Sequence, residues 1–242
     1  MLLVIPVSDV DIDKAELLFR RIVSLRPIET TIVVPMTWKA WWDMDKLQKL
    51  LPQAYYYKLP SEEEIGWPES SNHMFYNTAL YVADHFPKEP WYFMEADTCP
   101  IKYSWWDVLQ GEYALAKKPY MGVISDTIRH IDNKFVKTGQ HMTGTAIYPA
   151  DFLSRCKEIH YLMRDPWDIE IGTHVLPQCH NTTLIAHRWS STGYYLEDGV
   201  IKITASRAKT AAHSQPIQPE AVVVHGCKDD SIYALDLSLV VG

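Results

Sequence analysis

Residues 91–97 read WYFMEAD, an apolar run that ends in two acids separated by one residue. The run Trp91–Met94 is typical of a strand buried on both faces of a parallel sheet. Because side chains alternate along a strand, Glu95 and Asp97 point to the same side if the pleat continues. Two carboxylates then share one small volume, and a divalent cation with hard oxygen ligands is the usual way to neutralise them. The alternative is structural: Glu95 caps a loop or pairs with a lysine, and Asp97 caps the turn before Trp105.

The stretches around this strand alternate between strand-like and helix-like patterns. Strand-like runs, apolar or β-branched, lie at Leu2–Val7, Thr30–Pro35, Ala54–Leu59 and Trp91–Met94. Helical spacing of apolar residues follows them, at 12–23, 41–51, 75–86 and 105–115. This alternation predicts an α/β fold with an open, mainly parallel sheet and helices on both faces. After Tyr120 we expect only short strands, at 120–124 and 143–148, joined by long polar connections.

Length and composition favour one globular domain spanning 1–242. The chain has 242 residues, 47% of them hydrophobic, so it can bury a full core. The net charge of −7 argues against a surface coated in positive charge for nucleic acid, although a local basic loop remains open. The chain has 9 Trp and 14 Tyr, and such rings stack well on sugars or bases.

Targeting signals and cysteine spacing bear on location. No apolar run approaches the roughly 18 residues of a membrane span, and no basic region precedes the apolar start of the chain. The four cysteines are scattered, which argues against a zinc knuckle or a dense disulfide framework. We therefore expect a soluble cytoplasmic protein with reduced thiols and no signal peptide.

The β-α-β-α-β beginning, followed by a strand that ends in acid-x-Asp, resembles the metal-binding element of glycosyltransferases with the GT-A fold, a Rossmann-like fold. In that family the acidic pair holds Mn²⁺ or Mg²⁺ against the diphosphate of a nucleotide-sugar. The metal acts as a Lewis acid on the leaving phosphate. The resemblance implies a nucleotide-sugar donor, with a UDP-sugar as the first expectation. Glu95 departs from the Asp usual in the family, so Asp97 is the better match.

A second match lies near the C-terminus, where residues 222–228 read VVVHGCK. This strand-like run is similar to the late His-Gly-x-Lys by which many GT-A enzymes complete the metal site and contact the diphosphate. The resemblance implies that His225 is the third metal ligand and that Lys228 contacts phosphate. A neutral imidazole is a good metal ligand, and Gly226 lets the backbone approach phosphate closely. Taken alone, His225 is more often an ordinary partly buried histidine.

The same resemblance assigns the donor-binding half to residues 1–118 and the acceptor side to 119–242. It implies that the loop after the first strand cradles the base and ribose, and that the segment Asn72–Asn77, which opens the helix before Trp91–Met94, faces the nucleotide-sugar. The loop residues concerned are Pro6, Val7, Ser8 and Asp9. Ordinary turn and cap chemistry is the alternative for all of these positions.

A base for the acceptor hydroxyl is expected in residues 165–170, DPWDIE. This segment is similar to the acidic one that supplies the base in inverting GT-A enzymes. Asp168 and Glu170 share a face if the segment is extended, and Trp167 can stack on a sugar. It is equally open that these acids cap the next helix, and a retaining enzyme needs no such base. In residues 140–149 we expect a strand in which Gly144 permits a close approach by sugar or acceptor.

Two locally basic segments, Arg129–Lys137 and Lys202–His213, suggest an anionic acceptor. Together with the acidic pair, the His-Met-Thr-Gly stretch at 141–144 and the late His-Gly-x-Lys also resemble small phage-encoded GT-A-like proteins. Some of these are thought to glycosylate hydroxymethylated pyrimidines in phage DNA. That resemblance implies 5-hydroxymethylpyrimidine DNA as the acceptor and the host cytoplasm as the location.

The expected function is therefore metal-dependent transfer of a sugar from a nucleotide-sugar to a hydroxyl. A surface glycan or lipid-linked sugar is the alternative acceptor. A non-catalytic module that binds sugars or nucleic acid is the alternative from another class. A nucleotidyltransferase ranks lower, because the first strand lacks the Gly-rich phosphate loop such enzymes commonly carry.

Overall fold

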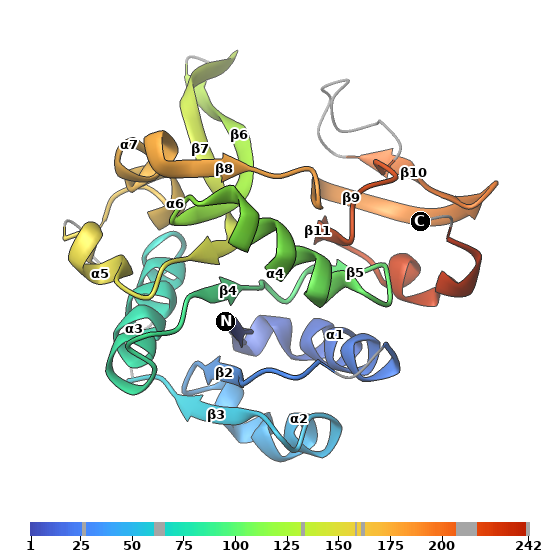
Figure 1. Cartoon of the computed structure of the whole chain (residues 1–242), viewed down its shortest axis with the longest axis horizontal. Helices are drawn as coiled ribbons and strands as arrows, with labels where there is room; N and C mark the ends of the chain where they lie inside the picture. Colours follow the sequence, from blue (N-terminus) through green and yellow to red (C-terminus); the bar gives the residue numbers. More distant parts are fainter. Residues whose placement is uncertain are drawn as a thin grey trace.

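A computed structural model describes residues 1–25, 28–60, 66–131, 134–157, 159–160, 163–206 and 217–240. Its larger sheet has seven strands in the order β3-β2-β1-β4-β7-β6-β8 (Figure 1). The strands are β1 Leu2–Val4, β2 Ile32–Met36, β3 Tyr55–Lys58, β4 Trp91–Phe93, β6 Tyr120–Ile131, β7 Lys134–Tyr148 and β8 Cys179–Asn181. Strands β1 to β4 are parallel, β7 is antiparallel to β4 and β6, and β8 is parallel to β6.

The smaller sheet has the strand order β10-β9-β11-β5. Its members are β5 Thr98–Pro100, β9 Ile185–Glu197, β10 Val200–Ser206 and β11 Val223–Cys227. Strand β11 is parallel to β9 and antiparallel to β5. Since β4 ends at Phe93 and β5 begins at Thr98, residues 94–97 carry the chain from one sheet to the other.

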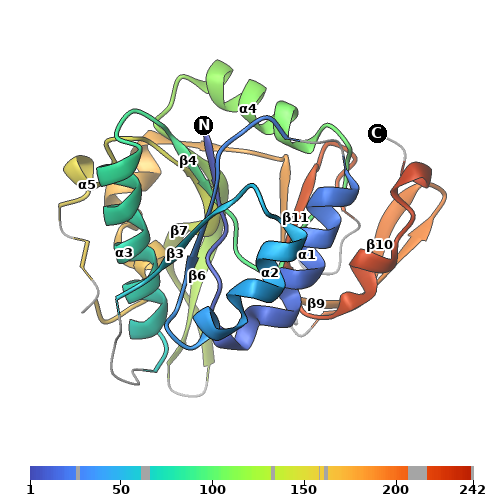
Figure 2. The ribbon, with the colours of Figure 1, turned by 90° about the horizontal axis from the view of Figure 1, so that it is seen from below.

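Helices cover both faces of the larger sheet because its central strands bury both sets of alternating side chains. Leu3 packs with α1 and α2 in one apolar cluster, and its neighbour Val4 packs with α3 in the other. Figure 2 shows α3 on one side of the strands and α1 and α2 on the other. The α-helices are α1 Ile12–Ser24, α2 Met44–Leu50, α3 Glu69–His85, α4 Trp105–Ala116, α5 Phe152–Arg155, α6 Trp167–Glu170 and α7 Gly172–Val175. Short 3-10 helices lie at Asp9–Asp11, Ala40–Asp43, Leu176–Gln178, Asp230–Ala234 and Leu237–Leu239. The predicted α/β fold is thus confirmed.

Two details differ from the sequence-based expectation. The short strands expected after Tyr120 are the inner ends of a long hairpin, β6 and β7. In its described residues the outer part of this hairpin pairs only within itself, and residues 136–140 are exposed, so burial does not impose an apolar alternation on them. Val23, expected on the buried stripe of α1, is 56% exposed. Among the described residues, the helices are too short or too polar to cross a membrane.

Candidate metal centre

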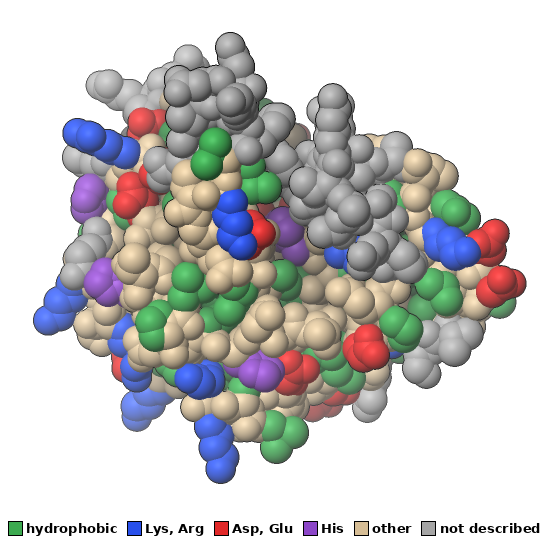
Figure 3. Space-filling view, turned by 90° about the horizontal axis from the view of Figure 1, so that it is seen from above, with side chains coloured by type: hydrophobic (Ala, Val, Ile, Leu, Met, Phe, Trp, Pro, Cys, Tyr) green, Lys and Arg blue, Asp and Glu red, His purple; other side chains and the backbone are tan. Residues whose placement is uncertain are grey.

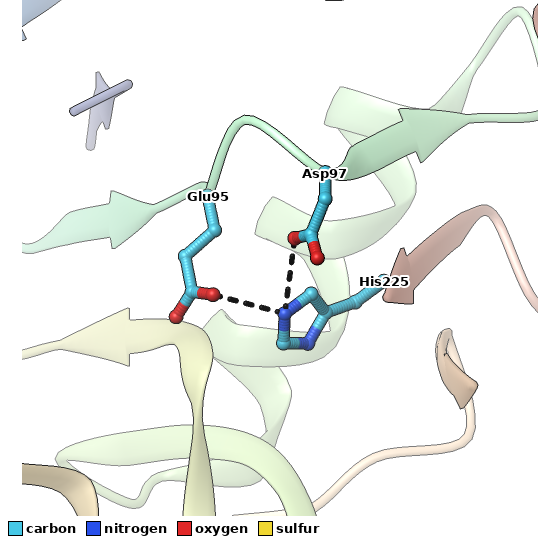
Figure 4. A group of neighbouring side chains, drawn as sticks. All are labelled: Glu95, Asp97 and His225. Atoms are coloured by element: carbon cyan, nitrogen blue, oxygen red, sulfur yellow. Dashed lines mark hydrogen bonds and ion pairs between the residues drawn. The ribbon is translucent and has the colours of Figure 1, made fainter. Parts of the chain in front are cut away.

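Glu95, Asp97 and His225 meet at the point where the chain passes between the two sheets (Figure 4). One ligand atom from each lies within 4.8 Å of the others. Nε2 of His225 is 3.1 Å from Oε2 of Glu95 and 3.5 Å from Oδ1 of Asp97. The structure therefore brings together the three residues that the resemblance to GT-A enzymes implied as metal ligands.

The sheet register explains why residues so distant in sequence come together. Strand β11 pairs antiparallel with β5, which places His225 opposite Thr98, the residue after Asp97. Past that pair, the N–H groups of Gly226 and Cys227 donate to the carbonyl of Asp97 at 3.1 and 2.9 Å. Gly226 has φ of 91°, a conformation that glycine adopts without the strain of a side chain. The backbone thus fixes the carboxylate of Asp97 against the imidazole.

Gly144 on β7 leaves room for the Glu95 carboxylate. A Cβ at position 144 would lie 2.1 Å from Oε1 of Glu95 and 3.1 Å from Cζ2 of Trp167. In the structure the group that lies against Gly144 is the side chain of Glu95, a residue of the metal centre. An approach by sugar or acceptor at Gly144 stays a prediction.

The charges of the cluster balance one another. Lys228 forms an ion pair with Oδ2 of Asp97. Burial raises the pKa of Asp97, but the charges of His225 and Lys228 outweigh it and hold that pKa below its usual value. Burial likewise lowers the pKa of His225, and the carboxylates of Glu95 and Asp97 more than reverse this and raise it. Without a metal, a protonated imidazole is thus the group that neutralises the two acids.

A divalent cation fits these donors. Oδ1 of Asp97 is buried and has no hydrogen-bond partner among the described residues, which is costly unless an ion or water satisfies it. Two carboxylates and an imidazole are ligands suited to Mn²⁺, and the carboxylates equally suit Mg²⁺. A bound cation would replace the charge of the imidazolium in neutralising the two acids, with Glu95, Asp97 and His225 as its ligands.

Asp11, at the N-terminus of α1, is a charged neighbour of the cluster. Its carboxylate makes no cap bond and instead accepts a hydrogen bond from the hydroxyl of Ser8. Burial raises the pKa of Asp11, Ser8 and Lys14 oppose this, and the charges of Asp97 and Glu95 add to the rise. Ser8 and Asp11 therefore extend the polar site from the metal centre to the loop after β1.

The other loop residues expected beside the nucleotide differ in their exposure. Pro6 and Val7 are buried, and the backbone of Val7 bonds to that of Pro35 and Thr37. Asp9 is exposed. The side chain of Ser8 is linked through Asp11 to the charged cluster, and a nucleotide contact stays a prediction for all four residues.

Asp168 is the second residue of α6, and its carboxyl group is close enough to Glu95 for the two charges to interact. Burial first, and the charge of Glu95 second, raise the pKa of Asp168 to about 7. Its Oδ2 lies 3.8 Å from Nε2 of His141, the first residue of the His-Met-Thr-Gly stretch.

Glu170 does not share that face. The segment Trp167–Glu170 is helical, so two residues two positions apart point in different directions, and the extended arrangement considered from the sequence is wrong. Glu170 is exposed, and its Oε1 accepts from the N–H of Asp165 at 3.1 Å. Asp168 alone of the two faces the cluster.

Asn72 is buried within the fold and positions α6. Its Nδ2 donates to the carbonyls of Met163 and Asp165 at 3.2 and 3.1 Å, and its Oδ1 accepts from the N–H of Trp167 at 2.7 Å. Trp167 in turn stacks on Phe75 with a ring separation of 3.5 Å. The donor contact predicted for Asn72 has no support from this placement.

The basic segments contribute little free positive charge among the described residues. Lys137 pairs with Asp126 at 2.7 Å, and Lys202 pairs with Glu197. The face in Figure 3 shows Lys and Arg scattered among acidic side chains over its described part. Arg207, Lys209 and His213 lie outside the described residues, as do the side chains of Arg129, His130 and Lys134.

No family model matches the sequence, and no curated protein matches it with significance. Solved structures do match the fold. The apo structure of WbbM, a bifunctional glycosyltransferase, aligns over 95% of this chain at 9% identity with a TM-score of 0.59. The structure of an active-site mutant of LgtC aligns over 95% of the chain at 10% identity with a TM-score of 0.51. The chain covers 88% of the LgtC structure but only 46% of the WbbM structure. This likeness confirms the GT-A type of α/β fold.

Proposed function

We propose that this protein is a divalent-metal-dependent glycosyltransferase, which moves a sugar from a nucleotide-sugar to a hydroxyl acceptor. The observation that carries the proposal is the meeting of Glu95, Asp97 and His225 just beyond the carboxyl end of β4. Ligands of open α/β sheets bind beyond the carboxyl ends of the strands. The shared fold with WbbM, which is described as a glycosyltransferase, supports the same class of activity.

In this proposal Glu95, Asp97 and His225 hold Mn²⁺ or Mg²⁺. When bound, the cation neutralises the diphosphate of the donor and stabilises it as the leaving group. Lys228, beside Asp97, adds a second positive charge at the same place. Ser8 and Asp11 offer polar groups on the side of the loop after β1. A UDP-sugar is the first donor to test.

Asp168 is the base of an inverting reaction in this proposal. The acceptor oxygen bonds to the anomeric carbon, the bond from that carbon to the diphosphate breaks, and the diphosphate keeps the electron pair. The hydroxyl proton passes to the carboxylate of Asp168. A pKa raised to about 7 suits a base that works near neutral pH. Asp168→Asn is expected to lower turnover by about 100-fold or more while donor binding persists.

Glu170→Gln is the matched comparison for that variant. Glu170 lies on the same short helix and faces away from the cluster, so this change is expected to leave turnover close to the wild-type value. The anomeric configuration of the product tests the stereochemistry independently. A retained configuration would remove the role of Asp168 as base.

The acceptor is the finer part of the proposal. Hydroxymethylated pyrimidine in DNA rests on the sequence resemblance and the two basic segments, and the described lysines of those segments are already paired with acids. Transfer of labelled sugar to hydroxymethylated DNA, with unmodified DNA as control, tests it. Transfer to neither would move the acceptor to a glycan or a lipid-linked sugar.

The activity itself is tested by release of nucleoside diphosphate from a panel of nucleotide-sugars, with Mn²⁺ or with EDTA. We expect metal-dependent release from one donor, lost in Asp97→Asn and kept in Asp84→Asn. Asp84 is a suitable control because its side chain is 83% exposed on α3. Donor binding without turnover, unchanged in Asp97→Asn, would instead favour a sugar-binding module.

A further inference from the structure

We propose that His187 is a positioning residue for the metal centre: it accepts a hydrogen bond from Nδ1 of His225 and so keeps Nε2 of His225 free to bind the cation. The inference rests on the proposed function, because it assumes that Glu95, Asp97 and His225 bind a metal. It concerns a residue that no sequence pattern singled out.

Strand register places the two imidazoles together. In the smaller sheet β9 runs parallel to β11, and His187 is the register partner of His225. Partners in neighbouring strands direct their side chains to the same face of a sheet. The two rings lie 4.8 Å apart between centroids, with an angle of 47° between their planes. The two Nδ1 atoms are 3.0 Å apart, a hydrogen-bond distance.

The other nitrogen of His225 faces the carboxylates. Nε2 lies 3.1 Å from Glu95 and 3.5 Å from Asp97, and Figure 4 shows it on the side of the ring that points to both acids. A metal bound there needs the lone pair of Nε2, so the proton of a neutral His225 must sit on Nδ1. The ring therefore requires a hydrogen-bond acceptor next to Nδ1.

His187 supplies that acceptor. With His225 donating from Nδ1, His187 accepts at its own Nδ1 and carries its proton on Nε2. His225 is buried, so without the acceptor its Nδ1–H would be left unsatisfied, at a cost of about 1–3 kcal/mol. The ring would then favour the tautomer with the proton on Nε2, which donates to Glu95 and has no lone pair for a cation. Groups that hold the second nitrogen of a metal-bound histidine typically change metal affinity by about 10- to 100-fold when removed.

Two variants of similar size separate this role from simple packing. In His187→Asn the side-chain oxygen can occupy about the place of Nδ1 and accept the same bond, whereas His187→Leu fills the space without an acceptor. Mn²⁺ affinity is measured on the full chain without donor, by electron paramagnetic resonance of the free ion. Melting temperatures in EDTA show that both variants are folded.

We expect His187→Leu to weaken Mn²⁺ binding by about 10- to 100-fold, and His187→Asn to stay within about threefold of the wild-type protein. Equal affinity in both variants, whether unchanged or equally weakened, would overturn the role of His187. In that case wild-type binding of Mn²⁺ leaves the proposed function intact. A wild-type protein that binds no Mn²⁺ would overturn the proposed metal centre and this inference together.

Discussion

Gly144 creates the space in which the Glu95 carboxylate lies, because a Cβ at position 144 would come within 2.1 Å of Oε1 of Glu95. Gly144→Ala is expected to move the flexible Glu95 side chain and, because the added Cβ lies 3.1 Å from Cζ2 of the buried Trp167, to lower the melting temperature modestly. Displacing a metal ligand is expected to weaken Mn²⁺ binding by about tenfold or more. Calorimetric titration with Mn²⁺ and a melting curve measure the two effects.

Gly139→Ala is the control for this substitution. It lies in the same strand, β7, and a Cβ there would meet nothing within 4 Å. Unchanged Mn²⁺ affinity in Gly144→Ala, with the fold intact, would show that the position of Glu95 does not matter for the metal.

Asp168 makes a pH-dependent contribution to stability in the metal-free protein. Its folded pKa of about 7 lies above the unfolded value of about 3.9, so the folded state disfavours the charged form. The destabilisation is absent below the unfolded pKa, grows as pH rises, and is complete above about 7. The asparagine in Asp168→Asn cannot ionise, so this variant is not destabilised in this way at high pH. In EDTA, its melting temperature relative to wild type is therefore expected to rise from pH 4 to pH 8 and then level off. A constant difference across that range would contradict the raised pKa.

The pH dependence of the contribution from His225 has a different origin. Its folded pKa is also raised, but for an imidazole a raised pKa means that the folded state favours the charged form. Its ion pairs with Glu95 and Asp97 stabilise the metal-free protein fully below the unfolded pKa of about 6.5. That contribution is lost as pH rises through the higher folded pKa. Mn²⁺ needs the neutral ring, so its stabilising effect is expected to grow over the same interval. Melting curves with EDTA and with Mn²⁺ from pH 6 to pH 9 test this, and a Mn²⁺ effect independent of pH would count against His225 as a ligand.

Asn72 is a buried residue whose hydrogen bonds hold the start of α6, the helix that carries Asp168. Asn72→Leu leaves the N–H of Trp167 and two carbonyls without their partner, which is expected to cost about 1–3 kcal/mol of unfolding free energy. Turnover is expected to fall more than donor affinity, because α6 loses its anchor. Asn77→Leu, on the same helix, removes one local bond to the carbonyl of His73 and is expected to cost less. Denaturant unfolding of both variants measures the difference, and equal costs would argue against the anchoring role.

The parallel strands and their helices could be predicted from the sequence because each of these elements has a recognisable pattern within its own residues. Buried parallel strands read as apolar runs, and the helices between them show helical spacing, so β1 to β4 and their helices follow from pattern alone. The smaller sheet was missed because β5 has three residues and β9 carries no alternation that marks it as a buried strand. Strand β11 joins this sheet by pairing Val223 with Ile185, 38 residues earlier, and with Pro100, 123 residues earlier, and no local pattern records such pairings.

The same distinction holds for the site. Glu95, Asp97, His225 and Lys228 stand in short motifs with a chemical meaning, and the structure brings them together. Asp11 and His187 have no such motif: strand register brings His187 against His225, and the charges of the cluster act on Asp11. The sequence could not show whether Asp168 or Glu170 faces the cluster, because this depends on whether the segment is extended or helical.

The central claim is that Glu95, Asp97 and His225 form a metal-dependent donor site. The most direct test is the melting temperature of the wild-type protein and of Asp97→Asn with a panel of nucleotide-sugars, each with and without Mn²⁺. A ligand that binds only the folded state raises the melting temperature, by an amount equivalent to about 2.7 kcal/mol at a hundred times its Kd. We predict a shift with one nucleotide-sugar that requires Mn²⁺ and disappears in Asp97→Asn. No shift with any donor, or an equal shift in Asp97→Asn, would contradict the account.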